Sequence, residues 1–216
     1  MRLLFILFSM SLMGQSSYQI ATLKYSGGGD WYSNPSSLKN LIIFCNENLN
    51  MNIEENYDIV EPSSKKVFNY PFIHMTGHGN VSFSNSDITN LRKYLLGGGF
   101  LHIDDNYGMD KFIRNEVKKI FPDKEWIELP KNHKIYNIVY EFKEGLPKIH
   151  VHDNKKPQGL AIIHKNRIVC FYSYETDLSD GWEDRTVHNN PQNTRIKALK
   201  MGANILAYSM NPNAIK

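Results

Sequence analysis

The strongest constraint on the fold is a segment in which two short apolar runs flank an amphipathic stretch. The runs cover residues 72–75 and 100–103, and each has the length of a buried strand. Apolar residues at helical spacing lie between them, namely Ile88, Leu91 and Leu95. A strand, a helix and a second strand within about thirty residues form a right-handed crossover. The two strands are therefore predicted to lie parallel in one sheet.

Local signals mark the two ends of this helix. Ser86 is predicted to cap it, with Asp87 in the first turn. Residues 97–99 are three consecutive glycines, which suit the left-handed conformation that commonly ends a helix.

The rest of the chain continues the alternation. Strands are predicted at residues 18–24 and 57–60, and amphipathic helices around residues 38–49, 112–121 and 196–210. Two β runs late in the chain are predicted to form an antiparallel hairpin, at residues 160–164 and 168–174. The fold class is therefore α/β, with a mostly parallel sheet, helices on both faces and a late antiparallel hairpin. One domain is expected, over residues 18–212.

The N-terminus has the pattern of a signal peptide. Arg2 precedes an apolar run at residues 3–13, which is followed by small and polar residues up to Ser17. A membrane-spanning helix needs about 20 apolar residues, so this run is too short to span. The alternative is a buried first element of the domain. The sequence favours a signal peptide at residues 1–17 and an exported protein, periplasmic or secreted, whose mature chain has no transmembrane segment.

Composition excludes one class of partner. The net charge is +3 and the Lys and Arg residues are scattered, whereas nucleic-acid binding typically concentrates them on one face. In an exported protein Cys45 and Cys170 could pair. Each lies in an apolar run, however, and two buried free thiols are expected.

Gly-rich and acidic loops follow several of the predicted strands. In open α/β sheets, ligands bind outside the carboxyl ends of the strands, so these loops are expected to form one site. Each loop also has a structural explanation, with glycines in turns and aspartates as helix caps. The catalytic candidates are His78, Asp104, Asp105 and Glu183. The ligand-binding candidates are Gly28, Gly29, Asp30, Trp31, Asn106, Asp177 and Trp182.

Carboxylates this close together cannot all ionise. Either one keeps a proton and acts as a general acid, or a hard cation lies between them. No cofactor is expected beyond such a divalent cation. His150 and His152 lie on one face of an extended segment and suit a metal, but no third ligand has a diagnostic spacing. His102 is expected to be a hydrogen-bonded core histidine.

The two adjacent aspartates are predicted to differ in role. Successive residues of a strand point to opposite faces. Asp104 is expected to face the crevice with His78 and Glu183, while Asp105 turns toward the following helix as a cap. Replacing Asp104 by Asn is then expected to relieve repulsion without loss of stability.

Several motifs in combination resemble a bacterial family, domain of unknown function 4159, over residues 19 to 210. They are YPFIHMTGHG (70–79), LRKYL (91–95), GGFLHIDD (98–105) and DGWE (180–183), with GGGDWY (27–32) and residues 130–136. The resemblance implies membership of the class I glutamine-amidotransferase-like superfamily and a flavodoxin-like sheet. In such a sheet the strand at Phe100 is expected to be central, between the strands that begin near Gln19 and Phe72.

The resemblance also bears on function. Amidotransferases carry a cysteine nucleophile at the turn that Asp104 and Asp105 occupy here, and neither Cys45 nor Cys170 lies at this turn. A Cys-dependent glutaminase is therefore not expected. Members of the family are often encoded beside MoxR-type AAA ATPases and von Willebrand A-like envelope proteins, which implies partners of that kind.

Two hypotheses follow. The first is a non-catalytic binding or assembly module of the cell envelope. The second is a carboxylate- or metal-dependent hydrolase, with Trp31 and Trp182 offering stacking faces to a sugar or cell-wall ligand.

Overall fold

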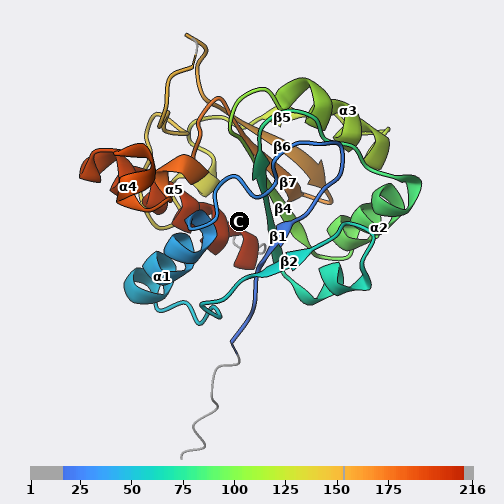
Figure 1. Cartoon of the computed structure of the whole chain (residues 1–216), viewed down its shortest axis with the longest axis horizontal. Helices are drawn as coiled ribbons and strands as arrows, with labels where there is room; N and C mark the ends of the chain where they lie inside the picture. The colour runs from blue at the N-terminus through green and yellow to red at the C-terminus, as the bar shows by residue number, and fades with distance from the viewer. Residues whose placement is uncertain (1–16, 153, 212–216) are drawn as a thin grey trace, which may run out of the picture.

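The computed structural model describes residues 17–152 and 154–211. Apart from Ser17, the predicted signal peptide lies outside the described residues. The described chain forms one seven-stranded sheet in the order β2-β1-β3-β4-β7-β6-β5 (Figure 1). The strands are β1 (Ala21–Leu23), β2 (Asp58–Val60), β3 (Phe72–Gly77), β4 (Phe100–Asp105), β5 (Ile127–Glu128), β6 (Gln158–His164) and β7 (Arg167–Tyr174).

The sheet is mostly parallel. β1 pairs in parallel with β2 and β3, β3 with β4, and β4 with β7. The predicted crossover between β3 and β4 is therefore confirmed. β6 pairs antiparallel with both β5 and β7, an arrangement compatible with the expected late hairpin.

One of the two predicted neighbours of β4 is correct and the other is wrong. β4 is the middle strand and β3 lies beside it, but its second neighbour is β7 and not β1. β1 instead pairs on the far edge of β3, where Thr22 aligns with His74. The place beside β4 is taken by a late strand, and Leu101 aligns there with Cys170.

Helices cover both faces of the sheet. The five α-helices of the described chain are α1 (Ser37–Leu49), α2 (Asn85–Leu96), α3 (Asp110–Ile120), α4 (Arg185–His188) and α5 (Gln192–Met210). Short 3₁₀ turns lie at η1 (Lys65–Asn69), η2 (Lys134–Tyr136) and η3 (Ser179–Gly181). In Figure 1, α1, α4 and α5 lie on one side of the strands and α2 and α3 on the other. In the described residues, no helix has both the length and the apolar character to cross a membrane.

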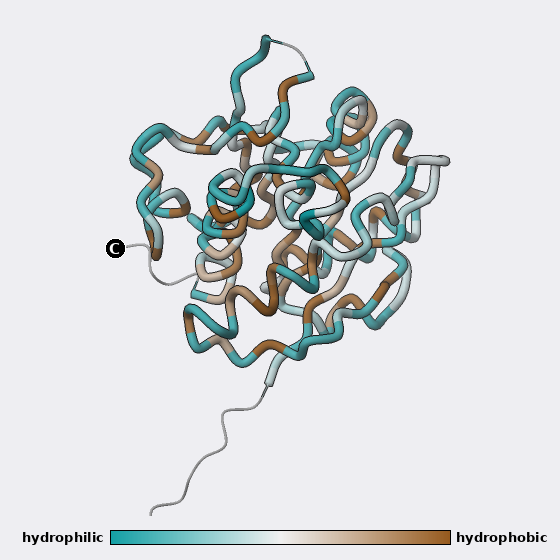
Figure 2. Tube along the Cα trace, turned by 60° about the vertical axis from the view of Figure 1, so that its left-hand side comes forward, coloured by the Kyte–Doolittle hydropathy of each residue, from teal (hydrophilic) through white to brown (hydrophobic). Residues whose placement is uncertain are grey.

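Alternating strand residues divide the interior into two cores. Phe72 and Phe100 pack with α1 and α5, whereas Ile73 and Leu101 pack with α2 and α3. Both faces of β3 and β4 are buried, as is typical of central parallel strands. In Figure 2, hydrophobic stretches of the chain (brown) run through the middle of the molecule, whereas the outer loops are mostly hydrophilic (teal). Apolar burial on both sides is the main stabilising contribution to such a sheet.

A capping residue begins α2, and a glycine-rich segment follows its end. Ser84, not Ser86, is the N-cap: its hydroxyl accepts from the Asp87 backbone N–H, and the Asp87 carboxylate accepts from the Ser84 N–H. This reciprocal pair starts the helix one turn before Asp87. At the other end, Gly99 passes so close to Tyr94 that a Cβ would lie 2.2 Å from the ring. Only glycine allows the chain to enter β4 there.

The two cysteines are buried free thiols, as expected. Cys45 belongs to α1 and faces the core that α1 and α5 cover, whereas Cys170 belongs to β7 and faces the core that α2 and α3 cover. Burial raises the pKa of Cys45 to about 12 and also raises the pKa of Cys170. Neither thiol is available as a thiolate at neutral pH.

Candidate metal centre

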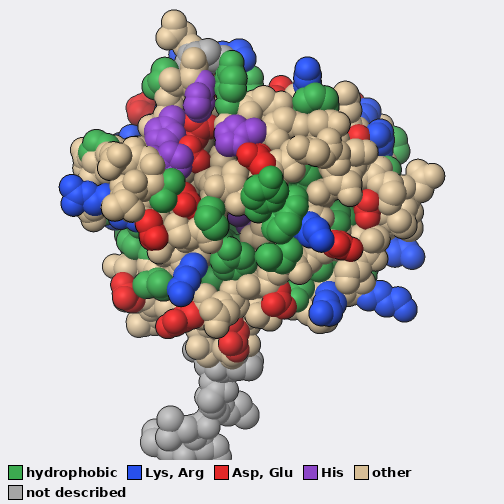
Figure 3. Space-filling model, in the orientation of Figure 1, with side chains coloured by type: hydrophobic (Ala, Val, Ile, Leu, Met, Phe, Trp, Pro, Cys, Tyr) green, Lys and Arg blue, Asp and Glu red, His purple; other side chains and the backbone are tan. Residues whose placement is uncertain are grey.

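The carboxyl ends of β3, β4 and β7 and the loops that follow them form one edge of the sheet. Figure 3 shows histidine side chains (purple) and acidic side chains (red) gathered around a hollow on this face. The sequence-predicted site residues do lie near this edge, but they separate into several small groups with different partners.

Asp104 is the centre of a buried network. Its carboxylate is fully buried. Ser173 Oγ donates to Oδ1 at 2.5 Å, and the backbone N–H and Oγ of Ser179 both donate to Oδ2 at 2.7 Å. Further donors to Oδ1 are Leu178 N at 3.2 Å and Thr176 Oγ1 at 3.3 Å. Asp104 thus fastens the loop after β7 to the end of β4.

The prediction that Asp104 faces His78 and Glu183 is therefore wrong. His78 pairs instead with Asp30, with 3.0 Å between Nδ1 and Oδ2, and both side chains are partly exposed. Glu183 accepts from the backbone N–H groups of Ser36 and Ser37 at 3.0 and 2.9 Å. It supplies the negative charge at the N-terminus of α1, where the helix dipole favours it.

Asp105 turns toward the next helix as predicted, but it is not the cap residue of α3, because the N-cap is Met109. Its Oδ1 accepts from the N–H groups of Tyr107 and Met109, at 2.9 and 3.0 Å, immediately before α3. Tyr172 donates its hydroxyl to Oδ2 at 3.0 Å. Burial raises the pKa of Asp105, and these hydrogen bonds act in the opposite direction.

The remaining candidates are mostly structural. Trp182 is fully buried and its Nε1 donates to the Ala198 carbonyl at 2.9 Å, so it offers no stacking face to a ligand. Trp31 is partly buried and packs edge-on against Tyr32, with 5.5 Å between ring centroids. Asn106 is buried and donates to Asn34 Oδ1 at 2.6 Å.

The glycines of the loop after β1 are needed for the conformation and close packing of the backbone. Gly28 has a φ of +90°, in the left-handed region that favours glycine. At Gly29 a Cβ would lie 2.6 Å from the Asn80 carbonyl oxygen, so the loop after β1 and the loop after β3 touch there.

Two overlapping groups of described residues could hold a metal ion, and the first lies around Asp177. It consists of His150, His152 and Asp177, whose ligand atoms all lie within 4.8 Å of one another. Asp177 Oδ2 lies 2.5 Å from His152 Nε2 and 3.8 Å from His150 Nδ1. Among the described residues this buried oxygen has no hydrogen-bond partner of good geometry.

A second trio shares His150. It adds Asp180 and His188, also within 4.8 Å of one another. His150 Nδ1 lies 2.9 Å from Asp180 Oδ2, and His188 Nε2 lies 3.8 Å from the same oxygen. The two trios together are called the His/Asp cluster below, and it joins the segment around residue 151 to the loops after β7.

The charges of the His/Asp cluster are strongly perturbed. Burial, together with repulsion by Asp104 and Asp180, raises the pKa of Asp177 to about 8. The hydrogen bond to Asp180 raises the pKa of His150 to about 8, against the effect of burial. Although burial opposes it, hydrogen bonds from His150 and Asn34 lower the pKa of Asp180. An added cation would relieve the crowding of negative charge at Asp177.

The backbone at the cluster is strained. Glu175 and Asp177 have φ values of 59° and 52°, in the left-handed region that non-glycine residues seldom occupy. Tyr107, with a φ of 90°, places its ring 4.8 Å from the His152 ring. Such strain costs about 1–3 kcal/mol per residue and concentrates at functional sites.

Sequence reasoning found only part of this cluster. His150 and His152 were identified as a metal-type pair, and Asp177 as a ligand-binding candidate, but the three were not connected. Asp180 and His188 were not proposed as ligands. The usable signal was the group of His and Asp residues between 177 and 188, directly after the last strand.

Comparison with known proteins supplies a family. No curated protein matched the chain. The model of one family, described as domain of unknown function (DUF4159), matches residues 19–210. This match covers almost the whole described chain, with the sheet, the Asp104 network and the His/Asp cluster inside it. The protein belongs to the DUF4159 family.

Proposed function

We propose that this protein is a divalent-metal-binding module of the bacterial cell envelope, built on an amidotransferase-like, flavodoxin-like fold. The observation that carries the proposal is the convergence of His150, His152 and Asp177 on one point. Two imidazoles and a carboxylate are a common ligand set for Zn²⁺. Burial of Asp177 and the orphaned Oδ2 atom support a bound cation at that place.

The surroundings of His150 suit a ligand role. Its Nε2 lies 2.9 Å from Asn190 Oδ1, and an amide oxygen can only accept, so Nε2 carries the proton. Nδ1 lies 2.9 Å from Asp180 Oδ2 and 3.8 Å from Asp177 Oδ2, so it can bind a metal near Asp177 once it loses the proton that it donates to Asp180. Hydrogen bonding of the second imidazole nitrogen in this manner fixes the tautomer of metal-bound histidines.

The binding role is preferred to glutaminase chemistry. A thioester mechanism needs a thiolate at the turn after the central strand. Asp104 lies in the last residues of β4, just before that turn, and the donors of the loop after β7 satisfy its carboxylate. Cys45 and Cys170 lie in the two cores, away from this edge.

Export and envelope partners are part of the same proposal. They are supported by the signal-type pattern at residues 1–17 and by the genomic neighbours that the family resemblance implies, which are MoxR-type ATPases and von Willebrand A-like proteins. A metal-stabilised loop edge could serve as the contact surface for such a partner.

A metal-dependent hydrolase is the second candidate. It is favoured by the openness of the cluster, because the side chains of His150 and His152 are 24% and 39% exposed. A three-ligand site with an open position leaves room for a water molecule, as in catalytic zinc sites. Hydrolysis of a sugar or cell-wall ligand would then require zinc and would disappear together with metal binding.

Calorimetric titration with zinc chloride tests the proposal. We expect saturable binding to the wild-type protein and affinity at least a hundredfold weaker in His152→Ala. His164→Ala, a histidine on β6 outside the cluster, is the matched control and should bind zinc like the wild type. Absence of zinc binding, or equal affinity in the wild type and His152→Ala, would overturn the proposal.

A further inference from the structure

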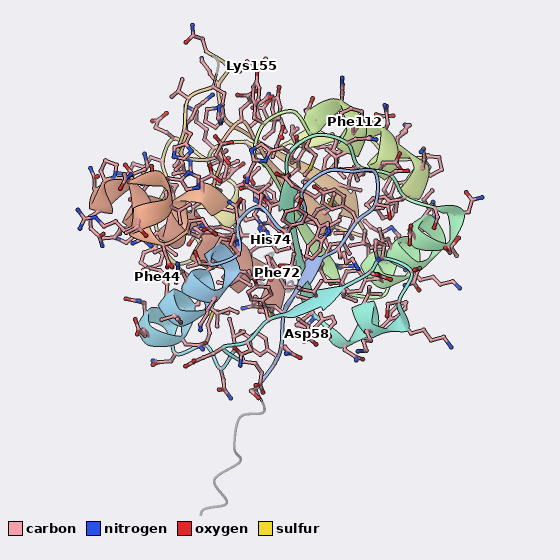
Figure 4. All side chains as sticks on the ribbon, in the orientation of Figure 1. Phe44, Asp58, Phe72, His74, Phe112 and Lys155 are labelled. Atoms are coloured by element: carbon pink, nitrogen blue, oxygen red, sulfur yellow. The ribbon has the colours of Figure 1, made fainter. Side chains whose placement is uncertain are left out.

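A second candidate site lies near the His/Asp cluster, and Asn34, which lines it, donates to Asp180 Oδ1 at 2.7 Å. A pocket of about 140 Å³ opens beside β1 and β3, close to the first residue of α1. Its walls include Trp31, Tyr32, Tyr57 and Ile59, and His74 lines it from β3 (labelled in Figure 4). The pocket shares no lining residue with the His/Asp cluster. Tyr32 and Ile59 are 65% and 55% exposed, so the pocket is open to solvent at its rim.

His74, which lines this pocket, has one unsatisfied atom. The residue is 1% exposed, and its Nε2 has no hydrogen-bond partner in the part of the chain that the structure describes. A buried polar atom without a partner costs about 1–3 kcal/mol. Native structures rarely retain such an atom unless a water or ligand pairs with it.

A chain of hydrogen bonds determines the protonation of that atom. Ser173 Oγ has one proton, and its two acceptors are the Asp104 carboxylate at 2.5 Å and the Ile103 carbonyl at 3.1 Å, neither of which can donate. It must therefore accept from His102 Nε2, 3.0 Å away. Burial lowers the pKa of both His74 and His102 to about 3, so both rings are neutral.

The rest of the assignment follows along the chain. Because His102 Nε2 carries the proton, His102 Nδ1 is an acceptor. It pairs with His74 Nδ1 at 3.1 Å, so His74 Nδ1 is the donor. His74 Nε2 is then unprotonated, so it offers a lone pair and not an N–H group.

We propose that this pocket binds a single phenol-type ring, whose hydroxyl group donates a hydrogen bond to His74 Nε2. The size agrees, since an apolar cavity of about 150 Å³ holds one benzene molecule. The walls agree as well, because Trp31, Tyr32 and Tyr57 can pack against an aromatic ring. A neutral imidazole offers no counter-charge, so an ionised ligand would be desolvated without compensation.

The matched probes are p-cresol and toluene, which differ by one hydroxyl group. We expect p-cresol to bind the wild-type protein roughly tenfold more tightly than toluene, because toluene leaves His74 Nε2 unpaired. In ¹⁵N NMR spectra, only p-cresol should shift the Nε2 resonance of His74. Equal affinity for the two probes, or no binding of either, would overturn the proposal.

Variants of His74 give an independent test. His74→Leu removes the acceptor, and the preference for p-cresol over toluene should disappear. His74→Gln provides a carbonyl oxygen near the position of Nε2 and should restore part of the preference. A preference that persists unchanged in a folded His74→Leu protein would contradict the assignment.

Two sources could supply such a ring, a small phenol or a tyrosine side chain of a partner. Titration with N-acetyl-tyrosine amide distinguishes them. If this compound competes with p-cresol, the pocket accepts a tyrosine of a polypeptide; if only p-cresol binds, the ligand is a small phenol. Both results support the phenol site and identify its source.

Discussion

Two aspartates at the same edge of the sheet, Asp104 and Asp177, are almost equally buried but have very different surroundings. Asp104 is 0% exposed and Asp177 is 2% exposed. Asp104 accepts hydrogen bonds from hydroxyl and backbone donors of the loop after β7. Asp177 has an imidazole 2.5 Å away and an Oδ2 atom with no well-directed hydrogen bond among the described residues.

The difference shows that burial of a carboxylate does not by itself indicate function. Donors that surround Asp104 stabilise its charge, and the group connects two segments of the fold. Burial, together with the nearby charges of Asp104 and Asp180, raises the pKa of Asp177 to about 8. Because Asp177 Oδ2 has no hydrogen-bond partner among the described residues, it can coordinate a cation once the carboxyl group is deprotonated. Removing the two carboxylates should therefore have opposite consequences.

Asp104→Asn should have the largest effect on stability. The amide has one oxygen in place of two and presents N–H groups to the donors of Ser179. We expect the free energy of unfolding to fall by about 3 kcal/mol or more, since hydrogen bonds to charged groups contribute about 1.5–3 kcal/mol each. This reverses the expectation from sequence, which was neutrality or stabilisation. Urea denaturation measures the change.

The control for this variant is Asp123→Asn. The Asp123 side chain is 63% exposed and pairs with Arg92 at the surface. Exposed ion pairs contribute about 0–1 kcal/mol, so little change is expected. If the free energy of unfolding falls by similar amounts in the two variants, the Asp104 network is not the main interaction that holds the loop after β7 in place.

Asp177→Asn should abolish metal binding and leave the fold intact. Asn retains the size of the side chain but is a far weaker ligand than a carboxylate. We expect zinc affinity to fall at least a hundredfold, which is about 2.7 kcal/mol at 25 °C. Zinc titration by calorimetry, with circular dichroism as a check on folding, measures this. Unchanged affinity would remove Asp177 from the ligand set.

The pH dependence of stability gives a third comparison. Asp177 has a folded pKa of about 8 against an ordinary value of 3.8, so the folded state binds more protons than the unfolded state between about pH 4 and 8. His150 acts in the same direction, since its folded pKa of about 8 lies above 6.5 and its stabilising contribution is lost as pH rises through 8. Without metal, the free energy of unfolding should therefore fall from pH 6 to 9, by about 2 kcal/mol after allowance for partial exposure.

Saturating zinc should reverse this slope. Metal binding requires deprotonated ligands, so affinity rises with pH over the same window. Denaturation at pH 6, 7.5 and 9, with and without zinc, measures both slopes. In Asp177→Asn the metal-free slope should be smaller than in the wild type. A wild-type protein whose stability rises from pH 6 to 9 without metal would contradict the assignment.

The sequence predicted the fold better than it predicted the site. The crossover between β3 and β4 was readable because its helical spacing and its glycines are local signals. The position of β7 beside β4 was not, because strand order depends on long-range packing. The face of Asp105 was predicted correctly because strand alternation fixes it, whereas its predicted role as the cap of α3 was wrong, since Met109 is the N-cap.

The errors at the site have a common physical cause. Alternation placed Asp104 on the side opposite Asp105, but it does not indicate that the loop after β7 folds over this carboxylate. The prediction of the His/Asp cluster was incomplete because His150 and His152 lie outside regular secondary structure. In such segments no periodicity indicates which residues a side chain contacts. Trp182 was treated as a ligand face although its indole has a partner on α5.

The smallest predicted effect concerns Asn190, which supports the cluster without binding the metal itself. Its Oδ1 accepts a hydrogen bond from His150 Nε2, which keeps a proton on Nε2 and makes Nδ1, beside Asp177 and Asp180, the nitrogen that binds the metal after deprotonation. Loss of such a supporting hydrogen bond typically weakens metal binding 10–100-fold. For Asn190→Ala we expect zinc affinity to fall about tenfold, at the lower end of this range. The reason is that Asp180 still orients the His150 ring through Nδ1 in the metal-free state. Asn48→Ala, on α1, is the matched control and should leave zinc affinity unchanged. If Asn190→Ala also leaves it unchanged, Nε2 and not Nδ1 of His150 binds the metal.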